Sequence, residues 1–489
     1  MRKRTPVKAA RRNGRGSRRT AKSGKVTKVQ RAKAKEAKAK KAKAAATQSS
    51  QSKHGFLGAF AQLVCPKQWR QIELAVGERR GEKPRVPLPV LLMGLVYHFF
   101  SGHGYLSEHL RQLFGIDYSD GAASERRQAL PWEVFVRLMR AALRPLANKK
   151  KHPTAFYRGW RLLAVDGVQF SMNNTPAVKQ ECKKAKSRRG KAAFAKIGAS
   201  VLLELGLHNP LAAVIARKQE SESQLTGRLL ANLPGGCLLL ADRLHGYGVF
   251  LAPVLDRCLE VMSHFLVRVK TGLAARVVKK LKDGSRLVDV AVRDPRHNHR
   301  VLRHIRLREI RVQIKRRGFR TTELRLWTSI LDEKQAPAME LAELYAMRWE
   351  HELYFRQLKS DLRRSERLQS QTLETAAQEI ASWIIASALL AQERARAAKG
   401  SLPVLRVSFA KLLELVRPLW LVLSLGGDLL TDQQQRALTK RVLDEAARCL
   451  TPKRRKRSCP RKVRQPIGKW PRLQSNHYCN FPVELVLLR

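Results

Sequence analysis

Short apolar runs that alternate with helical segments, between positions 160 and 270, constrain the fold of this chain most strongly. Five runs have the length of strands, at 162–165, 198–205, 212–216, 237–241 and 265–269. Between them, the stretches 223–231 and 248–258 are predicted helices. Three strands, a helix, a strand, a helix and a strand predict an α/β layer fold, in which helices cover a sheet.

The regions before and after this stretch have other patterns. Residues 54–150 have apolar residues at helical spacing, which predicts a helical N-terminal domain. Its basic faces could bind DNA, but basic helix faces are often only solvated, and both interpretations remain open. Residues 270–324 combine many Arg and Lys with short alternating segments, which predicts a β-rich insertion before a strand at 324–330.

A long helix is predicted from 339 to about 364, and further helices follow it. The basic segment 453–472 holds ten Lys and Arg, no acid, and Trp470. It is either a phosphate-binding tail or a solvated one. The expected divisions are an arm (1–53), a helical domain (54–150), an α/β core in two parts (151–269 and 325–400) around the insertion (270–324), and a helical C-terminal region with a basic tail (401–489).

The charge of the chain indicates a polyanionic partner. Lys and Arg number 97 against 39 Asp and Glu, a net charge of +58, which is far more than solubility requires. Residues 1–53 hold 20 Lys and Arg and one acid, Glu36, so the rest of the chain is strongly basic as well. This arm has almost no large apolar side chain to bury, and we expect it to be disordered when free. It is either a DNA-binding arm or a solubilising tail.

Several classes of protein are disfavoured. The seven cysteines include no C-x-x-C pair, so neither a zinc site nor a disulfide framework is indicated. The N-terminus lacks the apolar run of a secretory signal. The most apolar stretches, 88–100 and 381–391, are shorter than the roughly 18 to 20 residues of a spanning helix. We therefore expect a protein of the reducing cytosol with no membrane segment.

Asp166 and Asp242 each stand at the end of a predicted strand. Function in α/β sheets gathers at the carboxyl ends of strands, where carboxylates can hold magnesium together with phosphate oxygens. The alternative is that Asp166-Gly167 and Asp242-Arg243 only begin turns. Each aspartate is therefore either a candidate metal ligand or the first residue of a turn.

The predicted helix around position 350 carries four polar side chains in one stripe. They are Tyr345, Arg348, Glu352 and Lys359. At about 100° per residue, their spacings place them within a sector of about 60°. Glu350 points elsewhere by the same rule, so Glu352 is the candidate acid. Arg348 and Glu352 could also form a simple i, i+4 ion pair on a solvated helix.

The spacing Y-x2-R-x3-E-x6-K of this stripe resembles the signature of bacterial insertion-sequence transposases of the DDE type, in the family named after insertion sequence four. Asp166-Gly167 is similar to the first-aspartate motif of that family, which usually reads Asp-Gly-Thr. Asp242-Arg243, followed by Tyr247, is similar to the second motif, an Asp-Arg with a following aromatic residue.

The resemblance spans about residues 158–365, with a looser similarity on either side. It includes the order of the motifs, their strand context and the β-rich insertion before the glutamate. Val168 stands where the threonine is usual, and His245 lies within the second motif. Neither departure removes a candidate metal ligand.

The resemblance implies a catalytic core similar to ribonuclease H, with a central mixed sheet. It implies that Asp166, Asp242 and Glu352 are the catalytic residues and that they coordinate two divalent ions, Mg²⁺ or Mn²⁺. Such ions activate water or a DNA 3′-hydroxyl for in-line attack on a phosphodiester. The expected activity is cleavage and strand transfer at the ends of an insertion element, which is cut-and-paste transposition.

The resemblance also implies a set of DNA contacts. Arg348 and Lys359 would grip phosphates beside the scissile bond. Tyr345 would orient the end of the DNA, Trp349 would stack or pack, and Arg243 is a further candidate. The expected partners are the double-stranded DNA of the element ends and of the target, and a second copy of the chain in a synaptic complex. The expected location is the nucleoid in the bacterial cytoplasm.

Two other functions remain open from the sequence. The chain could be a catalytically inactive DNA-binding or architectural protein, or a nuclease of the same fold that performs no strand transfer. Two conspicuous side chains receive structural interpretations. Trp327 lies on an apolar strand and is expected in the core rather than as a base-flipping wedge, and His351 faces away from Glu352 on the helix.

Overall fold

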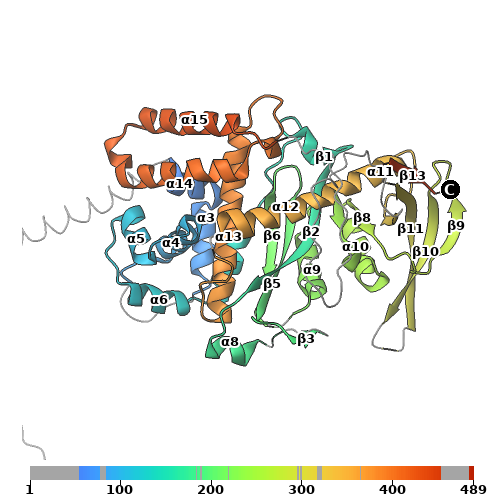
Figure 1. The fold of residues 1–489 in the computed structure, drawn as a ribbon, viewed down its shortest axis with the longest axis horizontal. Coiled ribbons are helices and arrows are strands. Elements are labelled where there is room, and N and C mark those ends of the chain that lie inside the picture. Colours follow the sequence, from blue (N-terminus) through green and yellow to red (C-terminus); the bar gives the residue numbers. More distant parts are fainter. Residues whose placement is uncertain are drawn as a thin grey trace, which may run out of the picture. The chain divides into compact units, whose positions relative to one another are not determined.

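The computed structural model describes residues 54–76, 84–182, 184, 186–187, 190–218, 220–294, 297, 300–315, 322–363, 365–452 and 484–488. The basic arm at 1–53 and the basic segment at 453–472 lie outside the described residues, so the expectations for them stay predictions. The described chain is a mixed α/β fold, as expected, in which helices cover a mixed sheet of parallel and antiparallel strands (Figure 1).

Five strands form the centre of the sheet, in the order β6-β5-β2-β7-β8. Their bounds are Trp160–Ser171 (β2), Lys196–Glu204 (β5), Asn209–Ile215 (β6), Cys237–Ala241 (β7) and His264–Arg268 (β8), and the short β1 (Phe156–Tyr157) pairs with β2. β2, β7 and β8 are parallel, whereas β5 and β6 run antiparallel to their neighbours. Every residue of β7 is buried, because the sheet is covered on both faces.

The sheet continues past β8 in the order β12-β11-β10-β9, with every pairing antiparallel. The bounds are Arg276–Lys280 (β9), Arg286–Asp294 (β10), Arg300–Lys315 (β11) and Thr322–Thr328 (β12), and β13 (Glu484–Leu487) pairs with β11. β9, β10 and β11 lie within 270–324, the stretch for which the sequence predicts a β-rich insertion, and β12 overlaps the strand predicted at 324–330. A separate pair is formed by β3 (Lys186–Ser187) and β4 (Gly190–Lys191).

A buried carboxylate holds three strands of this extension together. Glu309 of β11 lies opposite Arg286 of β10 and Trp327 of β12. It accepts hydrogen bonds from Arg286 Nε at 2.8 Å, from Trp327 Nε1 at 2.9 Å and from Arg325 Nε. Trp327 is buried, which confirms the expectation of a core residue.

Two helical layers sandwich the central strands. On one face lie α9 (Glu222–Leu229), which contacts β2, β5 and β6, and α10 (Gly248–Glu260), which contacts β8 and β10. On the other face lie α13 (Leu373–Ala397), against β5 and β6, and α12 (Trp349–Arg356), against β2. Alternate residues of β2 follow this division, because successive side chains of a strand point to opposite faces. Leu162 and Ala164 belong to the hydrophobic cluster of α13, and Leu163 and Val165 to that of α10.

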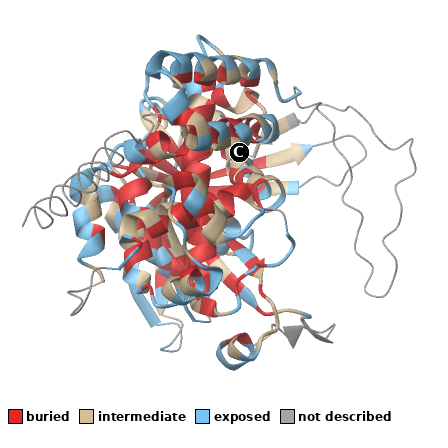
Figure 2. Ribbon diagram, turned by 90° about the vertical axis from the view of Figure 1, so that its left-hand side faces the viewer, coloured by how far each residue is buried: buried red, intermediate tan, exposed pale blue. Residues whose placement is uncertain are grey.

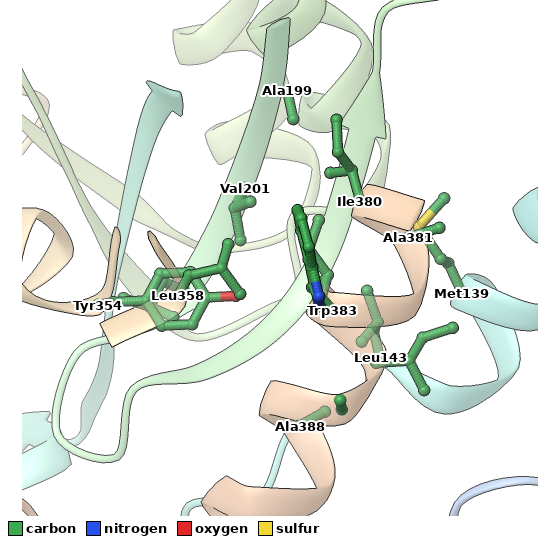
Figure 3. Packing of buried hydrophobic residues seen from close by; sticks show 14 of the residues in the cluster. Met139, Leu143, Ala199, Val201, Tyr354, Leu358, Ile380, Ala381, Trp383 and Ala388 are labelled. Atoms are coloured by element: carbon green, nitrogen blue, oxygen red, sulfur yellow. The ribbon is translucent and has the colours of Figure 1, made fainter. Parts of the chain in front are cut away.

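Helix α13 stands between the sheet and the N-terminal helices (Figure 1). In Figure 3 its residues Ile380 and Trp383 lie between Ala199 and Val201 of β5 and Met139 of α7. Its side chains are buried almost all round, which is typical of a helix at the centre of a large core. Buried residues accordingly gather in the interior of the described chain and exposed residues on its outer helices (Figure 2).

The remaining helices pack around α13. The N-terminal group comprises α2 (Gly55–Leu63), α3 (Pro66–Glu73), α4 (Leu88–Ser101), α5 (Leu106–Phe114), α6 (Asp120–Gln128) and α7 (Trp132–Ala142), and the C-terminal pair is α14 (Phe409–Gly426) and α15 (Asp432–Arg448). α4, α7 and α15 contact α13 directly, and α2 and α5 contact α14. The short α8 (Pro176–Glu181) follows β2. Among the described helices, none combines the length and the apolar character that a membrane crossing requires.

The helix predicted from 339 to 364 is present, but it changes type along its length. α11 (Ala338–Leu344) is followed by a 3-10 turn, η4 (Tyr345–Arg348), then by α12 and by a π turn, η5 (Gln357–Leu362). The assumption of about 100° per residue throughout is therefore wrong in detail. A 3-10 turn brings residues i and i+3 into line, and π turns are frequent at functional sites.

Candidate active site

Asp166 and Asp242 lie on neighbouring strands at the same level. The parallel ladder between β2 and β7 ends with Val165 opposite Ala241, so each aspartate is the next residue of its strand. β7 ends there, whereas β2 continues to Ser171 in its pairing with β5. The expectation that the strand ends at Asp166 is therefore wrong, because β5 still supplies backbone hydrogen bonds after β7 has ended.

Both aspartates continue the side-chain alternation toward the layer that contains α12. Asp166 lies opposite Val201 of β5, whose side chain packs on that side near Tyr354 (Figure 3). Asp242 has the same parity as Leu240, which belongs to the same hydrophobic cluster as Val201. The two carboxylates therefore share one face of the sheet, at the point where β2 and β7 separate.

Arg348 links this point to the helix. Its Nη1 lies 3.2 Å from Asp166 Oδ2 and 3.7 Å from Glu352 Oε1. Two carboxylates from different elements therefore converge on one positive charge. The ion pair between Arg348 and Glu352 that the sequence left open is present, but it is part of a larger cluster that includes Asp166.

Glu350 lies on the other side of α12, as its register predicted. Its Oε2 is 2.9 Å from Nε2 of the buried His208, whose Nδ1 lies 2.9 Å from Gln357 Oε1. His351 is also buried and donates from Nε2 to the carbonyl of Val201 at 3.0 Å. These contacts are made with residues other than the two aspartates.

Tyr345 supports the aspartate end of β7. The 3-10 turn places it in line with Arg348, and its hydroxyl donates to the carbonyl of Ala241 at 3.1 Å. Only 8% of Tyr345 is exposed, and burial raises the pKa of its phenol. Its observed contact is with the residue before Asp242, and its contact with DNA stays a prediction.

The remaining predicted DNA contacts are exposed side chains. Lys359 is in the π turn, with Nζ 5.5 Å from the centre of the Phe170 ring. Burial and neighbouring cations lower the pKa of Lys359, and Glu352 acts in the opposite direction. Trp349 is 46% exposed, and Arg243, in the turn after Asp242, is exposed as well.

A fourth carboxylate, which the sequence analysis missed, reaches the site from the opposite layer. Glu222 is the first residue of α9. Burial raises the pKa of Glu222 to about 7, and the charges of Asp166 and Asp242 and a side-chain hydrogen bond with Asp166 contribute to this rise. Nothing in the local pattern distinguished Glu222 from other acids in first helical turns. The available signal was Gly167, whose missing side chain leaves room for Glu222.

The electrostatics of the site follow from the crowding of acids. Burial raises the pKa of Asp166, and the charge of Asp242 raises it further, whereas the Gly167 amide and Arg348 lower it. His245 is fully buried beside this cluster; burial lowers its pKa, whereas the charges of Asp166 and Asp242 act in the opposite direction. The acids of the cluster outnumber Arg348, the cation that bridges Asp166 and Glu352.

In the described part of the chain, no three His, Cys, Asp or Glu side chains are gathered closely enough to hold a metal ion. Arg348 lies between Asp166 and Glu352 instead. The donor set nevertheless suits a divalent cation such as Mg²⁺, since carboxylate oxygens are hard ligands and two of them already converge on a positive charge. Metal binding would require the guanidinium to move away from these oxygens.

The site is partly open to solvent. The side chain of Glu352 is 45% exposed, and that of Asp166 is 14% exposed. A cavity of about 860 Å³ lies on the other side of α12, where Glu350, Arg356 and Arg394 line it. Glu352 is therefore accessible to a large substrate, and none of the three predicted carboxylates lines this cavity.

The region that contains the site is similar in sequence to known proteins. Residues 158–389 match the family described as Transposase DDE domain, and all the predicted site residues lie within this match. Over 360 residues the chain is 24% identical to the transposase InsG for insertion sequence element IS4 of Escherichia coli (strain K12). The similarity covers 72% of this chain and 77% of that protein.

Proposed function

Because this chain is a DDE-type transposase related to the transposase of insertion sequence element IS4, we propose that it cleaves DNA at the ends of an insertion element and joins them to a target. One observation carries the proposal: Asp166 and Glu352 converge on a single cation. Asp242, the next residue after the β2–β7 ladder, completes the set.

In this proposal Asp166, Asp242 and Glu352 hold two divalent ions, Mg²⁺ or Mn²⁺. When bound, such a pair activates the attacking oxygen and stabilises the leaving oxygen of an in-line displacement. The two strands fix the aspartates at one level, while the helix brings Glu352 from the side. The strand order β6-β5-β2-β7-β8, with three parallel central strands, supports a ribonuclease H-like core.

The chain's own cations would position the DNA. Arg348, once released from the carboxylates, offers a planar fork for a phosphate, and Lys359 offers a point charge. Arg243 and Trp349 are exposed, and they would contact the DNA backbone and its terminal bases. Tyr345 would hold the end of β7 in place through its hydrogen bond to Ala241, in addition to its predicted role at the end of the DNA.

A strand-transfer assay tests the function. The full chain is mixed with Mg²⁺, a labelled duplex that carries the element ends and a target plasmid. Joined product is expected, and a second copy of the chain is expected in the synaptic complex that forms it. Cleavage without joined product would instead identify a nuclease, and binding without cleavage would identify an architectural protein. In the cell, we propose a location on the nucleoid in the cytoplasm.

In this proposal Arg348 leaves the carboxylates and binds a phosphate. Its substitution should therefore have opposite effects on metal binding and on DNA cleavage. Arg348→Gln is expected to tighten Mn²⁺ binding to the DNA-free protein by about tenfold, which corresponds to the removal of roughly 1.4 kcal/mol of competition. Cleavage is expected to fall, because no guanidinium then holds the phosphate. Calorimetric titration with Mn²⁺ at pH 8 and a cleavage assay measure the two effects.

Arg356→Gln is the matched control, since Arg356 is an exposed cation on the far side of the same helix. It should change neither quantity. Weaker Mn²⁺ binding in Arg348→Gln would contradict the proposal that Arg348 competes with the metal for the carboxylates.

The arm gives a prediction about DNA affinity. Deletion of residues 2–53 is expected to weaken binding to all DNA sequences alike. The plot of log K against log salt is expected to flatten by about 0.9 for each phosphate that the arm neutralises in the full chain. The affinity and its dependence on salt are measured by binding titrations on specific and on random duplexes. A range of about 50 to 200 mM salt is suitable, because DNA affinity changes strongly over it. An unchanged slope would leave only the solubilising interpretation.

A further inference from the structure

Glu222 reaches Asp166 from the helical layer opposite to the one that supplies Glu352. α9 packs on β2, β5 and β6 from the face of Leu163 and Val165, whereas α12 packs on the other face. Glu222 nevertheless lies against Gly167, the residue next to Asp166, and the charge of Asp166 contributes to the raised pKa of Glu222. The contact is made at the level where β7 has ended and no longer separates the two layers.

Gly167 is the residue that permits this approach. A β-carbon at position 167 would lie 2.3 Å from Glu222 Cδ and 2.4 Å from its Cγ, which is far inside van der Waals contact. Gly167 lies within β2 and is paired with Ser200 of β5. Glycine weakens a strand interior and often marks the close approach of another group. Here the group that approaches is a carboxylate.

Ordinary helix capping does not explain the position of Glu222. Acids in a first turn are favourable because of the helix dipole. At α9, however, a capping box is already formed without Glu222: Ser221 Oγ accepts from Gln224 N, and Gln224 Oε1 accepts from Ser221 N. Glu222 is placed against another carboxylate instead, and two such groups repel each other when both are ionised.

A cation that binds both carboxylates would remove this repulsion. The predicted triad carries three negative charges, and two divalent ions carry four positive ones, so a fourth carboxylate balances the charge. We propose that Glu222 is a fourth metal-binding carboxylate of the site, which binds a divalent ion together with Asp166. This inference rests on the proposed metal-dependent function and extends its donor set.

The test is the affinity of the full-length, DNA-free protein for Mn²⁺, measured by calorimetric titration at pH 8. Glu222→Gln is expected to weaken binding by about tenfold or more, since a carboxamide is a much poorer ligand than a carboxylate. Gly167→Ala is expected to have the same effect, because its methyl group displaces Glu222. The double variant should be no worse than either single one, since both remove the same contact.

Glu374→Gln is the matched control. Glu374 also lies in a first helical turn, that of α13, and its side chain is 34% exposed against 32% for Glu222, but its partner is Arg217. Thermal melting without metal checks that each variant folds; the Gln variant keeps a hydrogen-bonding group beside Asp166. Mn²⁺ affinity in Glu222→Gln equal to that in Glu374→Gln would overturn the inference.

Asp166→Asn separates this inference from the function on which it rests. If Asp166→Asn loses Mn²⁺ affinity and Glu222→Gln does not, the fourth ligand is refuted while the triad stands. If neither variant loses affinity, the metal site itself is refuted. Loss in both, with the control unchanged, supports a site of four carboxylates.

Discussion

Asp242→Asn is expected to lower the rate of DNA cleavage about a thousandfold or more while leaving DNA binding intact. A bound metal ion contributes several kcal/mol to the transition state of phosphodiester cleavage, and each 1.4 kcal/mol or so corresponds to a factor of ten. The substitution removes a charged ligand and preserves the size of the side chain. Single-turnover cleavage of a labelled element end measures the rate, and gel-shift titration measures binding.

Asp166→Asn and Glu352→Gln are expected to behave in the same way. Glu350→Gln is the control for the helix, since Glu350 lies two residues from Glu352 but contacts His208 on the other side. Its cleavage rate should stay within about threefold of the unsubstituted protein, because it makes no contact with the reacting phosphate. A large loss in Glu350→Gln with activity retained in Glu352→Gln would reverse the assignment of the acid.

Glu309→Ala is expected to destabilise the protein by about 3 to 5 kcal/mol, because it leaves the guanidinium of Arg325, 8% exposed, buried and without its only charged partner among the described contacts. It also removes the acceptor of Arg286 and of the indole of Trp327. The free energy of unfolding, from urea titration, measures this destabilisation. Glu340→Ala is the control, since its pair with Arg158 is exposed and is expected to contribute about 1 kcal/mol or less.

The contribution of Glu309 to stability is also expected to depend on pH. Burial raises the pKa of Glu309, but the bonds from Trp327, Arg325 and Arg286 outweigh burial, and the net result is a pKa below the usual 4.5. A lowered pKa in the folded state means that the contribution of Glu309 is fully present above pH 4.5. It is lost as the pH falls through the lowered value. Glu309→Ala should therefore reduce the acid-induced part of unfolding in this range, and an unchanged pH profile would contradict the assignment.

The central strands could be predicted because their burial leaves a clear sequence pattern. The apolar run predicts a strand at 237–241, and β7 is found at Cys237–Ala241, since a strand covered on both faces must be apolar throughout. The continuation of β2 past Asp166 could not be predicted. Asp-Gly is typical of turns, and the bonds that keep this segment extended come from β5, whose position depends on the rest of the sheet.

Some features of the candidate site could likewise be predicted from the sequence, and others could not. The register of Glu352 against Glu350 is a local property of one helix, and the sequence was sufficient to predict it. The 3-10 and π turns on either side were not predictable, because contacts such as that of Tyr345 with Ala241 are made with other parts of the fold. Glu222 lies far from Asp166 in sequence and on another layer, so only the folded chain brings the two together.

The position of α13 has a consequence for the order of events during synthesis. The helices from α2 to α7 are complete at Ala142, but α13, which α4 and α7 contact directly, begins at Leu373, roughly 230 residues later. At ribosomal rates of about 5 to 20 residues per second, their apolar faces await a partner for on the order of 10 to 50 s. A polypeptide that stops before α13 lacks the surface that these helices need. Interrupted copies of such a gene would accordingly yield chaperone and protease substrates rather than compact fragments that compete for DNA.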